Sequence, residues 1–225
     1  MAFSCQEYAK LFVALARDVG VHAYYVHLEK DFRGRIVYHD CAAVFADGKA
    51  LLADPAYRWF GPPHKEYLIL DDLQAIAHHF FQPSGTGKDV ARCRLAEKLH
   101  PNFAWGQVTM VSAQMGEGLW EDARKTLAGA LHLAPDRWDG YEMQGMLDAH
   151  DGKPKEAIGS LRKSLALNPA YAATHFYLAL VMLSEGQLKE AREEFRSSLQ
   201  FDPPQEIAQS ARHAIAEINE KIGSG

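Results

Sequence analysis

Apolar residues recur at helical spacing in two separate parts of this 225-residue chain. Near the start, Tyr8, Leu11, Phe12 and Leu15 repeat every three or four residues, as along one face of a helix, and Gly20 ends the run. Beyond residue 100 the same spacing returns in one segment after another. The pattern therefore predicts one amphipathic helix at the start and an array of helices in the second half.

The pattern between these two parts is typical of strands. An apolar run, Ile36–Phe45, is followed by Asp47-Gly48, a dipeptide that favours a two-residue hairpin turn. A second run, Lys49–Asp54, ends at Pro55. These segments predict an antiparallel hairpin.

The register of that hairpin determines which side chains meet. If Asp47-Gly48 forms the turn, Asp54 lies opposite Cys41, and His39 lies two residues along on the same face. Diagonal neighbours of this kind are about 7–8 Å apart, a gap that a His and an Asp side chain can bridge. A slip of one residue would place the side chains on opposite faces. The hairpin therefore predicts a pair between His39 and Asp54.

Cys5 stands at the beginning of the first helix, where the peptide dipoles favour the nucleophilic thiolate. With His39 as the base and Asp54 orienting its imidazole, the three residues form a candidate catalytic triad. The alternative is a buried cysteine, a structural histidine and an aspartate that ends a strand. We take the three together as catalytic.

Residues 3–60 resemble the core of the transglutaminase-like cysteine hydrolases. The stretches that carry the resemblance are Ser4–Ala9, Asp18–Val26, Tyr38–Val44 and Ala53–Pro55. The resemblance implies an α+β papain/transglutaminase-like core over residues 1–65, made of a helix and an antiparallel sheet. It also implies that peptide bonds, isopeptide bonds or glutamine amides are the substrates.

The chain departs from that family at three points. Phe3 stands where the family usually has a glycine, and Cys41 stands where it commonly has an aromatic residue. Only four residues precede Cys5, so we expect a core that lacks its N-terminal part or a reduced, inactive version of it.

The second half repeats with a period of 34 residues. Four positions keep this period, and they are Pro101, Pro135, Pro169 and Pro203, then Gly118, Gly152 and Gly186, then Ala123, Ala157 and Ala191, and Leu131, Leu165 and Leu199. This period is the signature of tetratricopeptide repeats, each a pair of antiparallel helices. We expect three repeats and a capping helix, Gln205–Ile222, over residues 101–222, forming an all-α solenoid.

Residues 66–100 are expected to connect the two parts. Leu68–Leu70 favours a short strand, and Asp71–Phe81 and Val90–Leu99 favour helices on either side of a loop, Pro83–Lys88.

Repeat arrays of this kind present a groove, lined by the first helix of each repeat, that binds an extended peptide or a partner helix. By repeat position, the groove residues would be Trp105, Val108, Met115, Glu142, Met146, Phe176, Leu180 and Leu183. The alternative is that some of these side chains pack on the connecting helices.

Composition and cysteine spacing limit the partners and cofactors that we expect. The net charge of −5 gives no support for binding to nucleic acid or to an anionic membrane, and no apolar run approaches 18 residues. The three cysteines show no metal or disulfide spacing, and the adjacent His78 and His79 would point apart on a helix. We therefore expect no metal and no cofactor, and a cytoplasmic protein by default.

Two functions stay open. The first is a cysteine hydrolase or acyltransferase that uses Cys5, His39 and Asp54, with the repeats recruiting a protein partner or substrate. The second is an interaction scaffold whose transglutaminase-like part is inactive.

Overall fold

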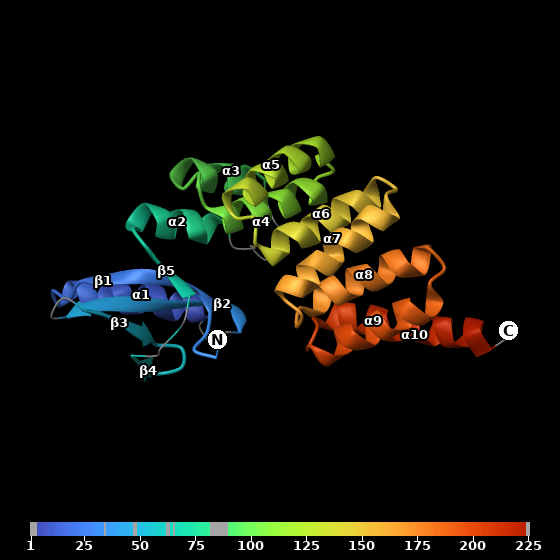
Figure 1. Cartoon of the computed structure of the whole chain (residues 1–225). Coiled ribbons are helices and arrows are strands. Elements are labelled where there is room, and N and C mark those ends of the chain that lie inside the picture. The colour runs from blue at the N-terminus through green and yellow to red at the C-terminus, as the bar shows by residue number, and fades with distance from the viewer. Residues whose placement is uncertain are drawn as a thin grey trace. The chain divides into compact units, whose positions relative to one another are not determined.

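The computed structural model describes residues 4–33, 35–46, 49–61, 64, 66–81 and 90–223. The chain divides into two compact units, residues 1–82 with 98–101 and residues 83–97 with 102–225 (Figure 1). We refer to them as the sheet unit and the repeat unit. The expected turn Asp47-Gly48, the expected loop Pro83–Lys88 and Phe3 lie outside the described residues.

The described residues of the sheet unit form a five-stranded antiparallel sheet and the helices α1 and α2. Its elements are α1 (Cys5–Asp18), β1 (Ala23–Lys30), β2 (Ile36–Ala46), β3 (Lys49–Asp54), β4 (Trp59–Phe60), β5 (Glu66–Leu70) and α2 (Asp72–Phe81). The strand order is β4-β3-β2-β1-β5, so β1 pairs with both β2 and β5. The sequence pattern does not predict β4, and β5 is longer than the expected Leu68–Leu70.

Local sequence sets both ends of α1. The Ser4 side chain accepts from the backbone N–H of Glu7, and the Glu7 carboxylate accepts from the backbone N–H of Ser4. This capping box satisfies two of the N–H groups that a helix start leaves unpaired. At the other end Gly20 has a φ of 81°, a conformation that glycine adopts without strain. Val13 of α1 then packs against one face of the sheet.

The hairpin of β2 and β3 has the predicted register. Ala46 pairs with Lys49, and Ala42 pairs with Ala53. Continuing that pairing by one residue brings Asp54 opposite Cys41. The predicted placement of His39 and Asp54 on neighbouring strands is therefore confirmed.

The repeat unit is a stack of antiparallel helix pairs. After α3 (Val90–Leu99) come α4 (Ala104–Gly116), α5 (Trp120–Leu133), α6 (Trp138–His150), α7 (Pro154–Leu167), α8 (Ala172–Ser184), α9 (Leu188–Gln200) and α10 (Gln205–Gly223). The pairs α4–α5, α6–α7 and α8–α9 are the three expected repeats, and α10 packs on α9 as the expected cap. The predicted helical solenoid is confirmed.

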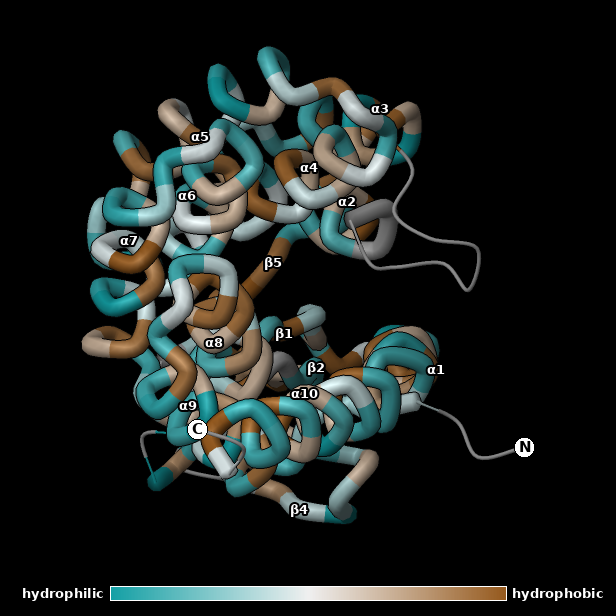
Figure 2. Tube along the Cα trace, turned by 90° about the vertical axis from the view of Figure 1, so that its right-hand side faces the viewer, coloured by the Kyte–Doolittle hydropathy of each residue, from teal (hydrophilic) through white to brown (hydrophobic). Residues whose placement is uncertain are grey.

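Residues at equivalent positions of the repeats have the same structural role. Ala123, Ala157 and Ala191 are fully buried where the two helices of each repeat meet. The turn glycines at the 34-residue period have φ values of 75°, 70° and 74°, which explains why glycine is needed there. Figure 2 shows α8 mostly in apolar colours and α10 mostly in polar ones, as expected for an inner helix and a cap.

Candidate functional site

Cys5 is the first residue of α1, and its side chain is half-buried. The thiol is hydrogen-bonded to the His39 side chain, and the backbone N–H of Asp40 donates to the same sulfur. These contacts, led by the one with His39, lower the pKa of the thiol although burial opposes the charged form. The site therefore favours the thiolate.

His39 is fixed from its other side by Asp54. The His39 Nε2 atom lies 2.6 Å from Asp54 Oδ2, and Asp54 is 1% exposed. The other carboxylate oxygen accepts from the backbone N–H of Tyr57, whose ring lies 5.2 Å from the imidazole. Because Nε2 is engaged by Asp54, Nδ1 is the ring nitrogen that remains for the Cys5 thiol.

The charge on His39 follows from these contacts. Burial works against a charged imidazole, but the hydrogen bonds to Asp54 and Cys5 outweigh it and raise the pKa of His39 to about 9. At neutral pH His39 is therefore charged, and an imidazolium held by a carboxylate stabilises the thiolate form of Cys5. The structure thus brings together the three residues that the sequence analysis selected.

The other two cysteines have different surroundings. Cys41 and Cys93 are buried, and burial raises the pKa of the Cys41 thiol. A thiol of this kind stays protonated at neutral pH. Cys5 is therefore the reactive candidate among the three.

The predicted groove residues differ in exposure. Leu180 is 41% exposed, whereas Val108 is buried in the core of the first repeat. Glu142 is also buried and accepts a hydrogen bond from Thr174. The remaining five predicted groove residues are half-buried, and they are Trp105, Met115, Met146, Phe176 and Leu183.

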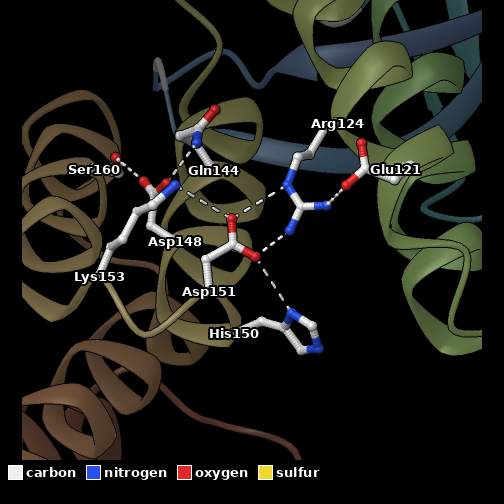
Figure 3. A network of polar contacts seen from close by, with 8 residues as sticks. All are labelled: Glu121, Arg124, Gln144, Asp148, His150, Asp151, Lys153 and Ser160. Carbon is white, nitrogen blue, oxygen red and sulfur yellow. Dashed lines mark hydrogen bonds and ion pairs between the residues drawn. The ribbon is translucent and has the colours of Figure 1, made fainter.

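A polar network joins the first two repeats (Figure 3). Arg124 of α5 forms ion pairs with Glu121 and with Asp151, which follows α6. On the neighbouring turns, Asp148 accepts from Gln144 and from the Ser160 hydroxyl of α7. These contacts connect residues of three successive helices at the surface of the stack.

Comparison with known proteins identifies the helical part of the chain. Two tetratricopeptide-repeat family models match residues 108–172 and 149–215. The curated relative, mouse (Mus musculus) DnaJ homolog subfamily C member 3, is 22% identical over 130 residues. That match covers 58% of this chain and 25% of the relative, so the chain corresponds to about a quarter of that protein. None of the described helices is long and apolar enough to cross a bilayer.

Solved structures show the same fold at low sequence identity. MamA is 22% identical, with a TM-score of 0.51 over 69% of this chain and 87% of its own. The APC/C hetero-tetramer Cut9-Hcn1 gives a TM-score of 0.54 at 16% identity, over 59% of this chain and 26% of that one. The thermophilic protein TTC0263 of Thermus thermophilus gives 0.50 at 20% identity, over 64% and 80%. The repeat unit is thus a tetratricopeptide-repeat solenoid, to which the chain adds a small antiparallel sheet.

Proposed function

We propose that this chain is an interaction scaffold whose tetratricopeptide repeats bind a protein or peptide partner. The observation that carries the proposal is the stack of three repeats, in which α4 contacts α6 and α6 contacts α8. First helices aligned in this way form one continuous side, and such sides bind extended peptides and helices. In the same fold, Cut9-Hcn1 is described as a hetero-tetramer.

Leu180 marks the surface of α8 to test. It is a large apolar side chain, 41% exposed, on the first helix of the third repeat. The half-buried Phe176 lies one helical turn before it, and Leu183 follows three residues later. This spacing presents apolar side chains along one helix face, which suits an apolar anchor residue of a partner.

A peptide library displayed on phage and selected on the full chain tests this proposal. Selected peptides should lose at least about tenfold in affinity for Leu180→Glu, because a charge at the anchor position leaves an unpaired group in the interface. The matched control is Leu167→Glu, an exposed leucine at the end of α7. Equal binding to both variants, or a library that yields no binder, would overturn the proposal.

The contacts of Cys5 favour a second function, acyl transfer by the thiolate. His39 and Asp54 hold that thiolate in the arrangement described above. In this mechanism the sulfur attacks the carbonyl carbon of an amide or ester, and a C–S bond forms. His39 then protonates the leaving amine or alcohol as its bond to the carbonyl breaks, which yields a thioester.

The second half of the cycle regenerates the thiol. Water attacks the thioester with His39 taking its proton, the C–S bond breaks, and a carboxylic acid is released. An amine in place of water gives a new amide. The resemblance to transglutaminase-like hydrolases makes peptide bonds, isopeptide bonds and glutamine amides the substrates to screen first.

The alkylation rate of Cys5 separates the two functions. At pH 7, iodoacetamide should react with Cys5 of the parent protein at least about tenfold faster than with Cys5 of the His39→Ala variant. The reason is that the imidazolium stabilises the thiolate. Both proteins carry Cys41→Ser and Cys93→Ser, so that only Cys5 reports, and both are treated with EDTA to remove bound metal. Equal rates in the two proteins would eliminate the acyl-transfer function and leave the scaffold function standing.

A further inference from the structure

A second group of ionisable side chains is buried in the sheet unit. It consists of His27 of β1, Asp40 of β2 and His78 of α2, which are 1%, 5% and 0% exposed. Among the residues that the structure describes, this is the one group of at least three His, Cys, Asp or Glu side chains arranged to hold an ion. The three ligand atoms all lie within 4.8 Å of one another.

The spacing of these atoms suits a metal ion. Asp40 Oδ1 lies 3.0 Å from His27 Nδ1 and 3.1 Å from His78 Nε2. Zinc holds nitrogen and oxygen ligands at about 2.0–2.2 Å, so two tetrahedral ligands are about 3.3 Å apart. The two oxygen–nitrogen spacings therefore match an ion's ligand shell to within a few tenths of an ångström, and the two ring nitrogens lie within 4.8 Å of each other. An ion there would replace the protons that the imidazoles share with the carboxylate.

Each of the three ligand residues lies in a regular secondary-structure element. His27 and Asp40 are directly paired residues of β1 and β2, so they lie on the same face of the sheet. His78 comes from α2, which contacts β1 and β5, and its ring lies 4.5 Å from that of His27. Three different elements thus converge on one carboxylate oxygen.

The surroundings of Asp40 and His78 shift the pKa of both groups. Burial alone would raise the pKa of Asp40, but the hydrogen bonds to His27 and His78 outweigh it and hold that pKa well below its usual range. Burial lowers the pKa of His78.

We propose that His27, Asp40 and His78 bind a divalent transition-metal ion, best matched by Zn²⁺, which fastens α2 to β1 and β2. Two imidazoles and a carboxylate form a ligand set that zinc accepts. The burial of all three residues closes the site to substrates, so the ion is structural. A water molecule supplies the fourth ligand. This inference does not depend on either proposed function.

Titration of the full, EDTA-treated chain with Co²⁺ tests the site, because four-coordinate cobalt absorbs strongly in the visible. All three cysteines are replaced by serine, so that no thiolate contributes. We expect one Co²⁺ per chain with a four-coordinate spectrum, displaced by one equivalent of Zn²⁺. We also expect Zn²⁺ to raise the unfolding temperature of this protein, since an ion that binds the folded state stabilises it.

Substitutions locate the ion. His27→Gln and His78→Gln should each weaken Co²⁺ binding at least about 100-fold, whereas His22→Gln, at an exposed histidine of the same unit, should leave it unchanged. Far-UV circular dichroism of the metal-free variants shows whether they fold. If a variant does not fold, the Co²⁺ titration of the cysteine-free parent tests the proposal by itself. A six-coordinate spectrum, or no Co²⁺ binding, in that protein would overturn the proposed metal site. Unchanged affinity in both folded glutamine variants would overturn it as well.

Discussion

Among the described residues, the buried histidines lie in the sheet unit, whereas both units bury apolar side chains and carboxylates. In the repeat unit, Ala157, Leu161 and Phe195 are fully buried and belong to one apolar cluster. In the sheet unit, His27 and His78 are among the largest fully buried side chains. Apolar burial stabilises without regard to direction, whereas a buried polar group must find a partner at a defined geometry. The buried histidines of the sheet unit therefore depend on partners at a defined geometry, which the apolar cluster of the repeat unit does not.

The polar contacts of the two units differ in the side chains that they pair. Arg124 and Asp151 of the repeat unit pair where both are partly exposed. Thr174 of the same unit forms buried contacts with Glu142 and Ser164. In the sheet unit the Asp54 carboxylate that meets His39 is buried. Because low dielectric surroundings strengthen electrostatic interactions, substitutions there should change reactivity as well as stability.

The largest effect on stability is expected at Gly145 in α6. A Cβ atom at this position would lie 2.5 Å from Leu161 Cγ and 3.2 Å from the Ala157 carbonyl oxygen. Gly145→Ala should therefore lower the free energy of unfolding by about 1–3 kcal/mol, the usual cost of overpacking a core. Urea unfolding followed by circular dichroism measures the change.

Gly159 of α7 provides the matched control. It is exposed, and a Cβ atom there would have no heavy atom within 4 Å. Gly159→Ala should raise the free energy of unfolding by about 0.5–1 kcal/mol, because alanine loses less conformational freedom in a helix. Changes of the same sign in the two variants would show that close helix packing does not govern stability in this unit.

In the sheet unit, Asp54→Asn should act mainly on chemistry. Asparagine keeps the shape of the side chain but removes the charge that raises the pKa of His39. The alkylation rate of Cys5 at pH 7 should fall about tenfold, equivalent to about one pKa unit. Asp18→Asn, at an exposed position of α1, should leave the rate unchanged. A rate that is insensitive to Asp54→Asn would mean that the carboxylate does not support the thiolate.

The sequence predicted nearly all helices of the repeat unit, because the same pattern recurs in each repeat. Proline, glycine, alanine and leucine recur at the same positions every 34 residues, so an error in one repeat would conflict with the other two. Exposure of the groove residues was harder to predict. Val108 and Glu142 occupy first-helix positions but are buried by neighbouring helices, and repeat position alone does not reveal this.

In the sheet unit the sequence predicted only what local pairing dictates. The register of β2 and β3 follows from a two-residue connection, and it brought His39 and Asp54 onto neighbouring strands. The cluster around Asp40 depends on β1 and α2, which are far apart in the chain and show no repeated pattern. In the sequence His78 is adjacent to His79. In the structure its ring contacts His27, which lies 51 residues earlier in the sequence.

A smaller effect is expected where the first two repeats meet. Arg124→Ala removes the ion pairs with Glu121 and Asp151 at a partly exposed position. The unfolding temperature should fall by about 1–3 °C, and less in 1 M salt, which screens such pairs. Arg162→Ala, at an exposed position of α7, is the control. A fall as large as that caused by Gly145→Ala would show that surface charge governs the stack as much as its core.

The smallest expected effect is a pH dependence in the third repeat. His175 Nδ1 lies 2.7 Å from the Glu194 carboxylate and Nε2 lies 3.1 Å from the Pro169 carbonyl oxygen. Burial opposes the charged imidazole, but these hydrogen bonds raise the pKa of His175 above its usual value. The folded state therefore binds this proton more tightly than the unfolded state does. The resulting stabilisation is fully present below the unfolded pKa of about 6.5 and is lost as pH rises through the folded pKa.

Unfolding temperatures of the parent, His175→Gln and Glu194→Gln measure this contribution. The parent should exceed both variants by more at about pH 5.5 than at about pH 9, because the stabilisation is lost as pH rises through the folded pKa. The double variant should lose little more than either single one, because the two side chains act as one pair. A difference that grows with pH would instead mean that neutral His175 is the form that the repeat stabilises.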